Sequence, residues 1–379
     1  MKPQLLQKLQ QIAEQNLLDI QEHKKMGNHV VGFYCLYAPT ELAVAADSIP
    51  LPLCGTRQAP IEAAEETLPR NLCPLIKSSY GFAATDTCPF FRFSDMIVAD
   101  TTCDGKKKMF EIMSAIKPVH VLQLPQQQDF TAFLEPWKNE IEKLVSVLEK
   151  TTGKEITREK ISSAITLLNK ERRAKKRLMD VAKAKPSPIS GMEMLEILFK
   201  TGFFADKQKG IHLINEIVEE CNILIQKGES PYTGKTPRIL LTGVPTGLGS
   251  DKVVKILEES GANVVAFESC SGYKQTFQVD ETKDPVQALS EQYLSIPCSV
   301  MSPNQGRIDL LSQMVKEFSV DGVVDLTWQA CHTYNIESFS ISRLVQDSFK
   351  LPFLHLETDY SESDTEQLRV RIEAFLEMI

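Results

Sequence analysis

The chain has 379 residues, of which 42% are hydrophobic and 24% charged, and its formal net charge at pH 7 is −8. These values are typical of a soluble globular protein, and the length favours two α/β units with helical material between them over a single core. The acidic balance excludes functions that need a broad basic face, so we expect no nucleic-acid and no membrane partner. A negatively charged ligand would need a local positive patch.

The first segment predicts an amphipathic helix over residues 1–27, because its charges are spread along its whole length. A secretory signal would instead need an uninterrupted apolar core. No later segment has the roughly 18 consecutive apolar residues that are needed to span a bilayer. We therefore expect a cytoplasmic protein.

A first α/β unit is predicted over residues 28–130, where strand-like and helix-like segments alternate. The expected strands are at residues 29–36, 49–55, 94–103 and 117–125. The helical patterns that separate them include 40–48 and 104–116. Regular alternation of this kind predicts a parallel sheet covered by helices.

The middle of the chain, residues 131–235, is predicted to be a helical connector. Helical patterns occupy residues 133–153, 159–184 and 208–228, with a Pro- and Gly-containing break at 185–191. No strand-like alternation interrupts them. The connector therefore separates the first α/β unit from a second one.

The second α/β unit is predicted over residues 236–379. Its expected strands are at residues 237–243, 263–269, 321–329 and 351–357, and its expected helices at 251–261, 307–319, 336–349 and 366–379. The fold class is thus α/β, with two doubly wound, Rossmann-like (flavodoxin-like) parallel-sheet domains. Ligands of such sheets bind beyond the carboxyl ends of the strands, where the loops converge.

The nine cysteines are the most informative residues, and a reducing compartment argues against a disulfide framework. Cys103, Cys270 and Cys331 each follow a predicted strand, so three thiols from two units would face one cleft. Cys103 and Cys331 also precede predicted helices. A helix N-terminus stabilises a thiolate through its dipole and free N–H groups.

Three further cysteines lie in proline-containing loops. Cys73 and Cys88 are each followed by proline, and Cys298 follows one. A single loop cysteine is more often a small buried apolar residue, but six in loops or at strand ends favour a metal site. The sequence has no C-x-x-C pair, which is the usual mark of structural zinc, so an iron–sulfur cluster between domains is the better interpretation.

The remaining cysteines are assigned differently. Cys221 lies inside a helical pattern and is interpreted as core packing. Cys35 and Cys54 lie in apolar strands, where packing is favoured and a ligand role stays open. Residues 240–257 contain several glycines after a strand but lack the G-x-G-x-x-G pattern, so we expect a tight loop there rather than a dinucleotide site.

Several long stretches carry a family likeness: LPRNLCPLIKSSYG, SDMIVADTTCDGKKKMFE, VDGVVDLTWQACHTYNIES, LPFLHLETDY and RIEAFLEM. They resemble the 2-hydroxyacyl-CoA dehydratase and benzoyl-CoA reductase family over nearly the whole chain. The resemblance implies a four-iron cubane held by Cys73, Cys103 and Cys331. Three protein ligands would leave one iron open to a substrate or a bridging ligand.

The chain departs from a simple dehydratase subunit in its extra loop cysteines, and in this it is similar to the double-cubane cluster protein branch. That likeness implies a second trio of Cys88, Cys270 and Cys298, with Cys35 as the first substitute and Cys54 as a further one. A double cubane (8Fe-9S) is therefore the favoured cofactor. A single 4Fe-4S cluster is the alternative.

The resemblance implies an anaerobic enzyme, an iron–sulfur reductase component that reduces small molecules. Low-potential electrons would come from a separate homodimeric, ATP-hydrolysing iron–sulfur reductase. The chain itself has no G-x-x-x-x-G-K-[ST] phosphate loop, and we expect it to form a homodimer. The alternatives are a 2-hydroxyacyl-CoA dehydratase subunit and a non-catalytic electron carrier.

Three residues beside the expected cleft are candidates for catalysis. Lys106 follows Cys103 and would offset the charge of a cluster, although a solvated lysine is the simpler interpretation. His332, next to Cys331, would donate a hydrogen bond or a proton. Glu357 ends a predicted strand at the same edge, where it would serve in acid–base chemistry or in helix capping.

Overall fold

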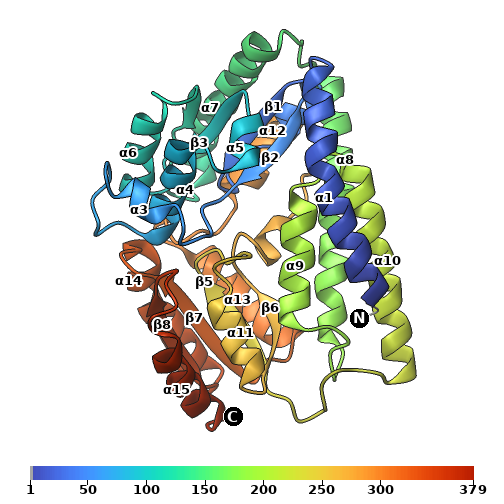
Figure 1. Cartoon of the computed structure of the whole chain (residues 1–379), viewed down its shortest axis with the longest axis vertical. Coiled ribbons are helices and arrows are strands. Elements are labelled where there is room, and N and C mark those ends of the chain that lie inside the picture. The colour runs from blue at the N-terminus through green and yellow to red at the C-terminus, as the bar shows by residue number, and fades with distance from the viewer. Residues whose placement is uncertain (1–2) are drawn as a thin grey trace.

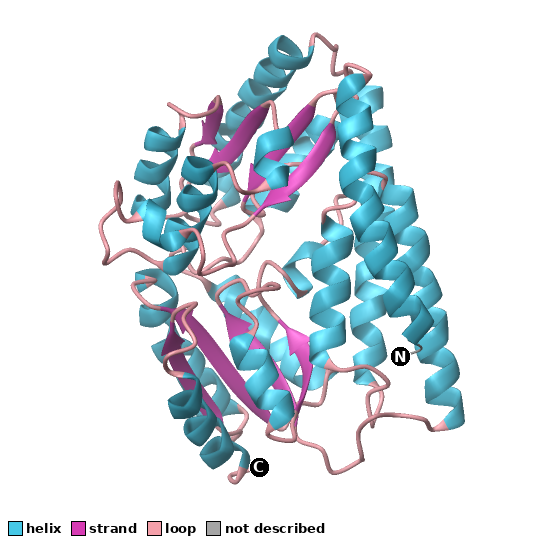
Figure 2. Ribbon diagram, in the orientation of Figure 1, coloured by secondary structure: helices cyan, strands magenta, loops and turns pink. Residues whose placement is uncertain are grey.

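The computed structural model describes residues 3–379 and contains two separate four-stranded parallel sheets (Figures 1 and 2). Helices flank each sheet, and a group of long helices lies beside both. The predicted fold class is confirmed, and each of the eight expected strands is present. No helix in the described part of the chain is both long enough and apolar enough to cross a membrane.

The first sheet has the strand order β2-β1-β3-β4, with every neighbouring pair parallel. β1 and β3 are buried along their whole length, as expected of inner strands covered on both faces. The elements are β1 (Val30–Tyr34), α2 (Glu41–Ala45), β2 (Ile49–Leu53), α3 (Ile61–Ala64), α4 (Pro74–Thr85), α5 (Pro89–Phe93), β3 (Met96–Asp100), α6 (Asp104–Met113) and β4 (Val119–Leu122).

The second sheet repeats this topology in the order β6-β5-β7-β8. In both sheets the order reverses beside the first strand in sequence, which is where doubly wound folds open a crevice. The elements are β5 (Arg238–Gly243), α11 (Lys252–Glu259), β6 (Asn263–Phe267), η2 (Tyr273–Thr276), α12 (Pro285–Leu294), α13 (Gln305–Glu317), β7 (Gly322–Trp328), α14 (His332–Arg343), η3 (Leu344–Ser348), β8 (Phe353–Thr358) and α15 (Thr365–Leu376).

The long helices come from the N-terminus and from the connector. Side-chain caps begin most of them: Asp129, Thr157, Ser190 and Asp206 each accept a backbone N–H at the start of a connector helix. The elements are α1 (Pro3–Lys25), α7 (Phe130–Thr152), α8 (Arg158–Asp180), η1 (Val181–Lys183), α9 (Gly191–Gly202) and α10 (Lys207–Lys227).

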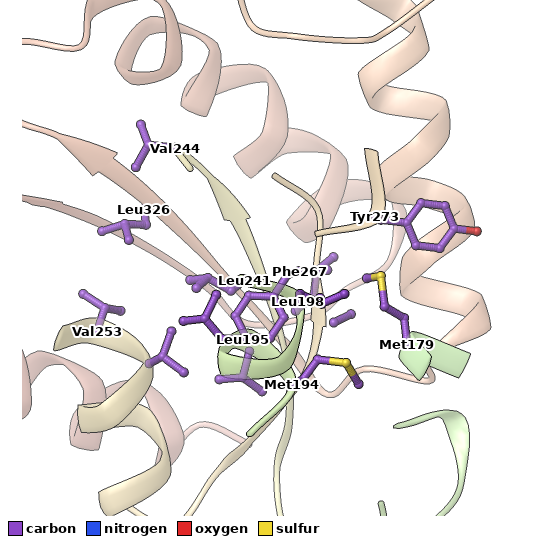
Figure 3. Close-up of a cluster of buried hydrophobic side chains, with 14 of the residues drawn as sticks. Met179, Met194, Leu195, Leu198, Leu241, Val244, Val253, Phe267, Tyr273 and Leu326 are labelled. Atoms are coloured by element: carbon purple, nitrogen blue, oxygen red, sulfur yellow. The ribbon is translucent and has the colours of Figure 1, made fainter. Parts of the chain in front are cut away.

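The connector is packed firmly against the second sheet. Met179 of α8 and Met194 of α9 lie in one buried cluster with Leu241 of β5 and Phe267 of β6 (Figure 3). Met179 and Phe267 are each 1% exposed. Close packing of this kind fixes the positions of α8 and α9 relative to the loops that follow β5 and β6.

One segment of the second half of the chain joins the core of the first sheet. Val286 and Leu289 of α12, and Cys298 after it, are buried in the same cluster as Val98 of β3 and Trp137 of α7. The division of the chain into units at residues 27, 130 and 235 stays a proposal, and it did not anticipate this crossing. The crossing places Cys298 in the core that covers the first sheet.

Candidate metal centre

The loops that follow the strands of both sheets meet around one cavity of about 310 Å³. Figure 1 shows the two sheets with these loops turned toward the middle of the molecule. Cys35 and Cys54 follow β1 and β2, Cys270 follows β6, and all three line the cavity. Side chains of α8 and α9 form the opposite wall. The cavity therefore lies where parallel sheets place their ligands.

Cys73, Cys103 and Cys331 form one cluster, which we call the first thiol group. The side chains of Cys73 and Cys331 are hydrogen-bonded to each other, and Cys103 is close enough to both to interact electrostatically. Cys73 and Cys103 come from the first half of the chain and Cys331 from the second. The structure thus brings together the three cysteines that were predicted to share a cubane.

Each member of the first thiol group is the N-cap residue of a helix: Cys73 of α4, Cys103 of α6 and Cys331 of α14. The backbone N–H of Lys106 donates to the Cys103 Sγ at 3.5 Å. Backbone N–H groups at the starts of α4 and α14 do the same for the other two thiols. Three helix N-termini therefore direct their positive ends at one small volume.

The thiols of this group share protons unequally. The hydrogen bond from Cys331 lowers the pKa of the Cys73 thiol against the effect of burial. The same bond, together with burial, raises the pKa of Cys331. Burial raises the pKa of Cys103, although Lys106 opposes this. The first thiol to ionise is thus Cys73, and the helix ends stabilise negative charge there.

Cys35, Cys270 and Cys298 form a second thiol group. Burial raises the pKa of Cys270 to about 12, and the neighbouring Cys298 adds to this effect. Burial also raises the pKa of Cys35, with smaller contributions from Cys270 and Cys298. Cys35 has φ +81°, a left-handed backbone that a non-glycine residue rarely adopts. With this backbone conformation, Cys35 lies at the end of β1 beside the other two thiols.

Lys106 lies between the two thiol groups. Its ammonium interacts with Cys103 of the first group and with Cys35 and Cys298 of the second. Burial opposes its charge, but these thiols and Asp100 outweigh burial and raise the pKa of Lys106. The Lys106 Nζ is 3.8 Å from an Asp100 carboxylate oxygen, and the side chain is 13% exposed. One nearly buried cation therefore interacts electrostatically with both thiol groups.

Cys88 was predicted to belong to the second trio, but the structure places it elsewhere. Cys88 is the N-cap residue of the short helix α5, and its electrostatic neighbour is Cys54. Both cysteines line a smaller, adjoining cavity of about 280 Å³ together with Arg57. Cys54 lines the large cavity as well, whereas Cys88 does not. Cys35, which was the first substitute, is the cysteine that lies beside Cys270 and Cys298.

The three catalytic candidates do not all lie at the large cavity. Lys106 lines the large cavity. His332 and Glu357 are exposed and do not line it, and Glu357 accepts a hydrogen bond from the Asn335 side chain at 2.9 Å. Catalytic roles for these residues stay predictions, and the geometry favours Lys106 among them.

The set of donors suits a cluster better than a single ion. No three His, Cys, Asp or Glu side chains within residues 3–379 surround a position for one metal ion. Zinc ligands would lie about 2.3 Å from one centre, whereas the thiols here form two spaced groups. Cys221, by contrast, is fully buried in the apolar face of α10, in agreement with its interpretation as packing.

A buried ionic network supports the loop that carries Cys270. Glu268 is fully buried, and one of its oxygens lies 2.5 Å from the Lys274 Nζ and 3.3 Å from the Arg307 Nε. The Arg307 guanidinium also pairs with Glu337 and lies 3.8 Å from Asp325. Removing one partner from such a network leaves an uncompensated buried charge.

The cations of the cavity wall were not predicted from the sequence. Arg172 and Lys175 of α8 and Lys207 of α10 line the cavity. Their helical patterns were recognised, but charged residues on a helix ordinarily face solvent. The basic run from Lys170 to Arg177 was the available signal, since only part of it can lie on one face of a helix.

Comparison with known proteins gives consistent results along the chain. Residues 35–379 match the family described as 2-hydroxyglutaryl-CoA dehydratase, D-component. The chain is 44% identical over 379 residues to the putative dehydratase subunit YjiM of Escherichia coli (strain K12), covering 100% of this chain and 98% of that protein.

A more distant relative is the (R)-phenyllactyl-CoA dehydratase beta subunit of Clostridium sporogenes, at 24% identity over 94% of this chain and 93% of that protein. The (R)-2-hydroxyglutaryl-CoA dehydratase subunit beta of Acidaminococcus fermentans is 21% identical over 99% of each chain. These relatives are matched over nearly their whole length, so the likeness extends to both sheets and the connector.

Proposed function

Because the chain belongs to the 2-hydroxyglutaryl-CoA dehydratase D-component family and is a beta-subunit-type component, we propose that it is the catalytic iron–sulfur component of a two-part reductase. It would hold a double cubane and reduce small molecules there. The electrons would come from a separate ATP-hydrolysing iron–sulfur reductase.

The observation that carries this proposal is the meeting of Cys73, Cys103 and Cys331 at three helix N-termini. Thiolates ligate iron in such clusters, and a cluster held by thiolates carries negative charge that N–H groups and dipoles offset. Two of the thiols lie on one half of the chain and one on the other. Ligation would therefore clamp the two halves together.

For the second cubane we propose Cys35, Cys270 and Cys298 as the ligands, in place of the trio that contained Cys88. All three interact electrostatically with one another, and Cys35 and Cys270 line the large cavity. Lys106 supports the arrangement, because one ammonium beside both thiol groups would offset the charge of two adjoining clusters.

Such a cluster supplies electrons one at a time at low potential. The protein's own contribution would be threefold. The thiol groups hold the metal, the buried Lys106 keeps a positive charge beside it, and the apolar side chains Leu198, Phe199 and Phe277 line the cavity and limit access of water. A small substrate would bind in this cavity.

The names of the relatives favour a second candidate, a 2-hydroxyacyl-CoA dehydratase subunit. We expect this candidate to hold a single cubane. It would need the first thiol group alone. Iron content separates the two candidates, since two cubanes bring about eight irons per chain and one brings about four.

Spectroscopy on protein purified without oxygen tests whether the centre is catalytic or only carries electrons. We expect carbon monoxide to change the electron paramagnetic resonance spectrum of the reduced protein, because an iron with an open coordination position binds it. An unchanged spectrum in the presence of full iron content would indicate a closed electron carrier and would contradict the proposal.

A further inference from the structure

The large cavity concentrates positive charge in a chain whose net charge is −8. The cations that line it are Lys106, Arg172, Lys175, Lys207 and Lys274. Three of them have a carboxylate close by: Lys106 pairs with Asp100 at 3.8 Å, Arg172 with Glu41 at 2.6 Å and Lys274 with Glu268 at 2.5 Å. The charge of these three is balanced locally.

Lys175 and Lys207 are different, because they share one carboxylate. The Glu171 Oε1 lies 2.9 Å from the Lys175 Nζ and 3.9 Å from the Lys207 Nζ. The lysine side chains are each 9% exposed and the Glu171 side chain 11%. Among the residues from 3 to 379, Glu171 is the only carboxylate that pairs with either lysine. One positive charge is left over in a nearly buried site.

The pKa of Glu171 agrees with this balance. Burial would raise the pKa of Glu171, but Lys175 and Lys207 outweigh burial and lower it to about 2. Glu171 is therefore ionised. Burial and the neighbouring Lys175 lower the pKa of Lys207, although Glu171 opposes them. A buried cation of this kind is stabilised by a further anion.

Both ammonium groups are held in place. The Lys207 Nζ donates to the carbonyl oxygen of Gly202 at 3.1 Å, and Lys175 is fixed by Glu171. An ammonium has three donors, so each keeps at least one for a ligand. The side chain of Asp206 already caps the first N–H groups of α10. The ligand would therefore meet the two lysines and not the helix terminus.

We propose that Lys175 and Lys207 bind the carboxylate of a small monocarboxylic acid, whose other end extends toward Cys270. A single excess positive charge matches a single negative one. A cavity of about 310 Å³ is at the small end for ligand sites, which span roughly 300–1,000 Å³, so a short acid fits better than a coenzyme A thioester. This assignment rests on the proposed function, which locates the cluster at the Cys270 end.

Titration calorimetry on the full-length protein, purified without oxygen, tests the subsite. The probes are crotonate and its neutral isostere crotonamide. We expect the wild type to bind crotonate at least tenfold more tightly than crotonamide, and we expect Lys175→Gln and Lys207→Gln to lose that preference. Lys209→Gln is the matched control, because this lysine of α10 is 54% exposed and pairs with Asp19. It should keep the preference.

Glu171→Gln gives a second and independent variant, should the lysine variants fold poorly. Removing the competing carboxylate should keep or increase the affinity for crotonate. No preference in the wild type, a preference that persists in both lysine variants, or a loss of crotonate binding in Glu171→Gln would each overturn the proposal.

Iron analysis of the same preparations separates the subsite from the cluster. Unchanged iron content in the lysine variants is expected. Loss of iron in them would assign the lysines to charge compensation of the cluster and overturn the subsite. Wild-type protein that holds no iron would instead contradict the proposed function, whatever its affinity for crotonate.

Discussion

The two thiol groups differ in what surrounds them. Cys73, Cys103 and Cys331 are N-cap residues of helices with ten or more residues, and backbone N–H groups face each sulfur. Cys35 and Cys270 follow strands and do not precede such a helix. Burial is the main cause of their raised pKa values. The first group is therefore prepared for negative charge by the backbone, while the second depends on Lys106 and on the network behind it.

This difference suggests unequal roles. A site with three helix dipoles holds an anionic cluster tightly in any redox state. A site that faces the cavity, without helix N-termini at its thiols, is more open to exchange and to substrate. We therefore expect the first group to anchor the metal and the second to meet the ligand.

The largest expected effect comes from removing an anchor. Cys103→Ala or Cys331→Ala, purified without oxygen, should lose much of its iron and of its thermal stability, because ligation couples to the docking of the two halves. Iron analysis and thermal unfolding measure both. Cys221→Ala is the control, since this fully buried thiol only packs in α10, and it should keep its iron. Full iron content in the Cys103 variant would refute the ligand assignment.

A second substitution pair sharpens the membership of the second group. Cys35→Ala should leave about half of the iron, since only the second cubane loses a ligand. Cys88→Ala should keep all of it, because Cys88 neighbours Cys54 and does not line the large cavity. Iron analysis of the two variants side by side is sufficient. The reverse result would restore the trio that contains Cys88.

Lys106→Met addresses the charge between the groups. The variant should keep its iron but have a lower reduction potential, because a nearby cation stabilises the reduced, more negative cluster. We expect a shift on the order of 60 mV, which is a tenfold change in a one-electron equilibrium. A redox titration measures it. Lys107→Met is the control, since Lys107 is exposed; equal potentials in the two variants would remove Lys106 from the site.

The smallest expected effect is a pH-dependent change in thermal stability when Glu171, the carboxylate between Lys175 and Lys207, is replaced. Glu171 has its pKa lowered to about 2 in the folded protein, so it contributes stability above its unfolded value of about 4.3. That contribution is lost as the pH falls through the folded value. The melting temperature of Glu171→Gln should therefore be below that of the wild type near neutral pH, and the two should converge toward pH 2.

Glu219→Gln is the control for this comparison, because the Glu219 side chain is 64% exposed and pairs with the half-exposed Arg177. It should have the melting temperature of the wild type throughout. A Glu171→Gln curve that runs parallel to the wild type down to pH 2 would contradict the ionised state of Glu171.

Particular residues explain how far the sequence could predict the site. Cys103 and Cys331 were predictable because a buried strand, a cysteine and a helix start follow one another in sequence, and parallel sheets gather such positions at one edge. The place of Cys35 was not, since its neighbour Cys298 reaches it only through the crossing of residues 279–301 onto the first sheet. The proximity of Cys35 and Cys298 depends on tertiary packing, which the periodicity of the sequence does not predict.

The buried lysines were unpredictable for a related reason. Lys207 is the first residue of a helix whose sequence pattern is amphipathic. Its neighbour Lys209 is exposed, as such patterns predict. Only the packing of α8 and α10 around the cavity makes Lys207 nearly buried while Lys209 stays exposed. The cations that face a ligand are thus recognised from the assembled wall and not from the run of charges in the sequence.

The stoichiometry of iron and acid-labile sulfide in full-length protein kept free of oxygen tests the central claim most directly. Two thiol groups that each hold a cubane predict about eight irons per chain in the wild type and about four in Cys35→Ala. Iron near four in both proteins would contradict a second cubane at Cys35, Cys270 and Cys298. Absence of iron from both would contradict the metal centre as a whole.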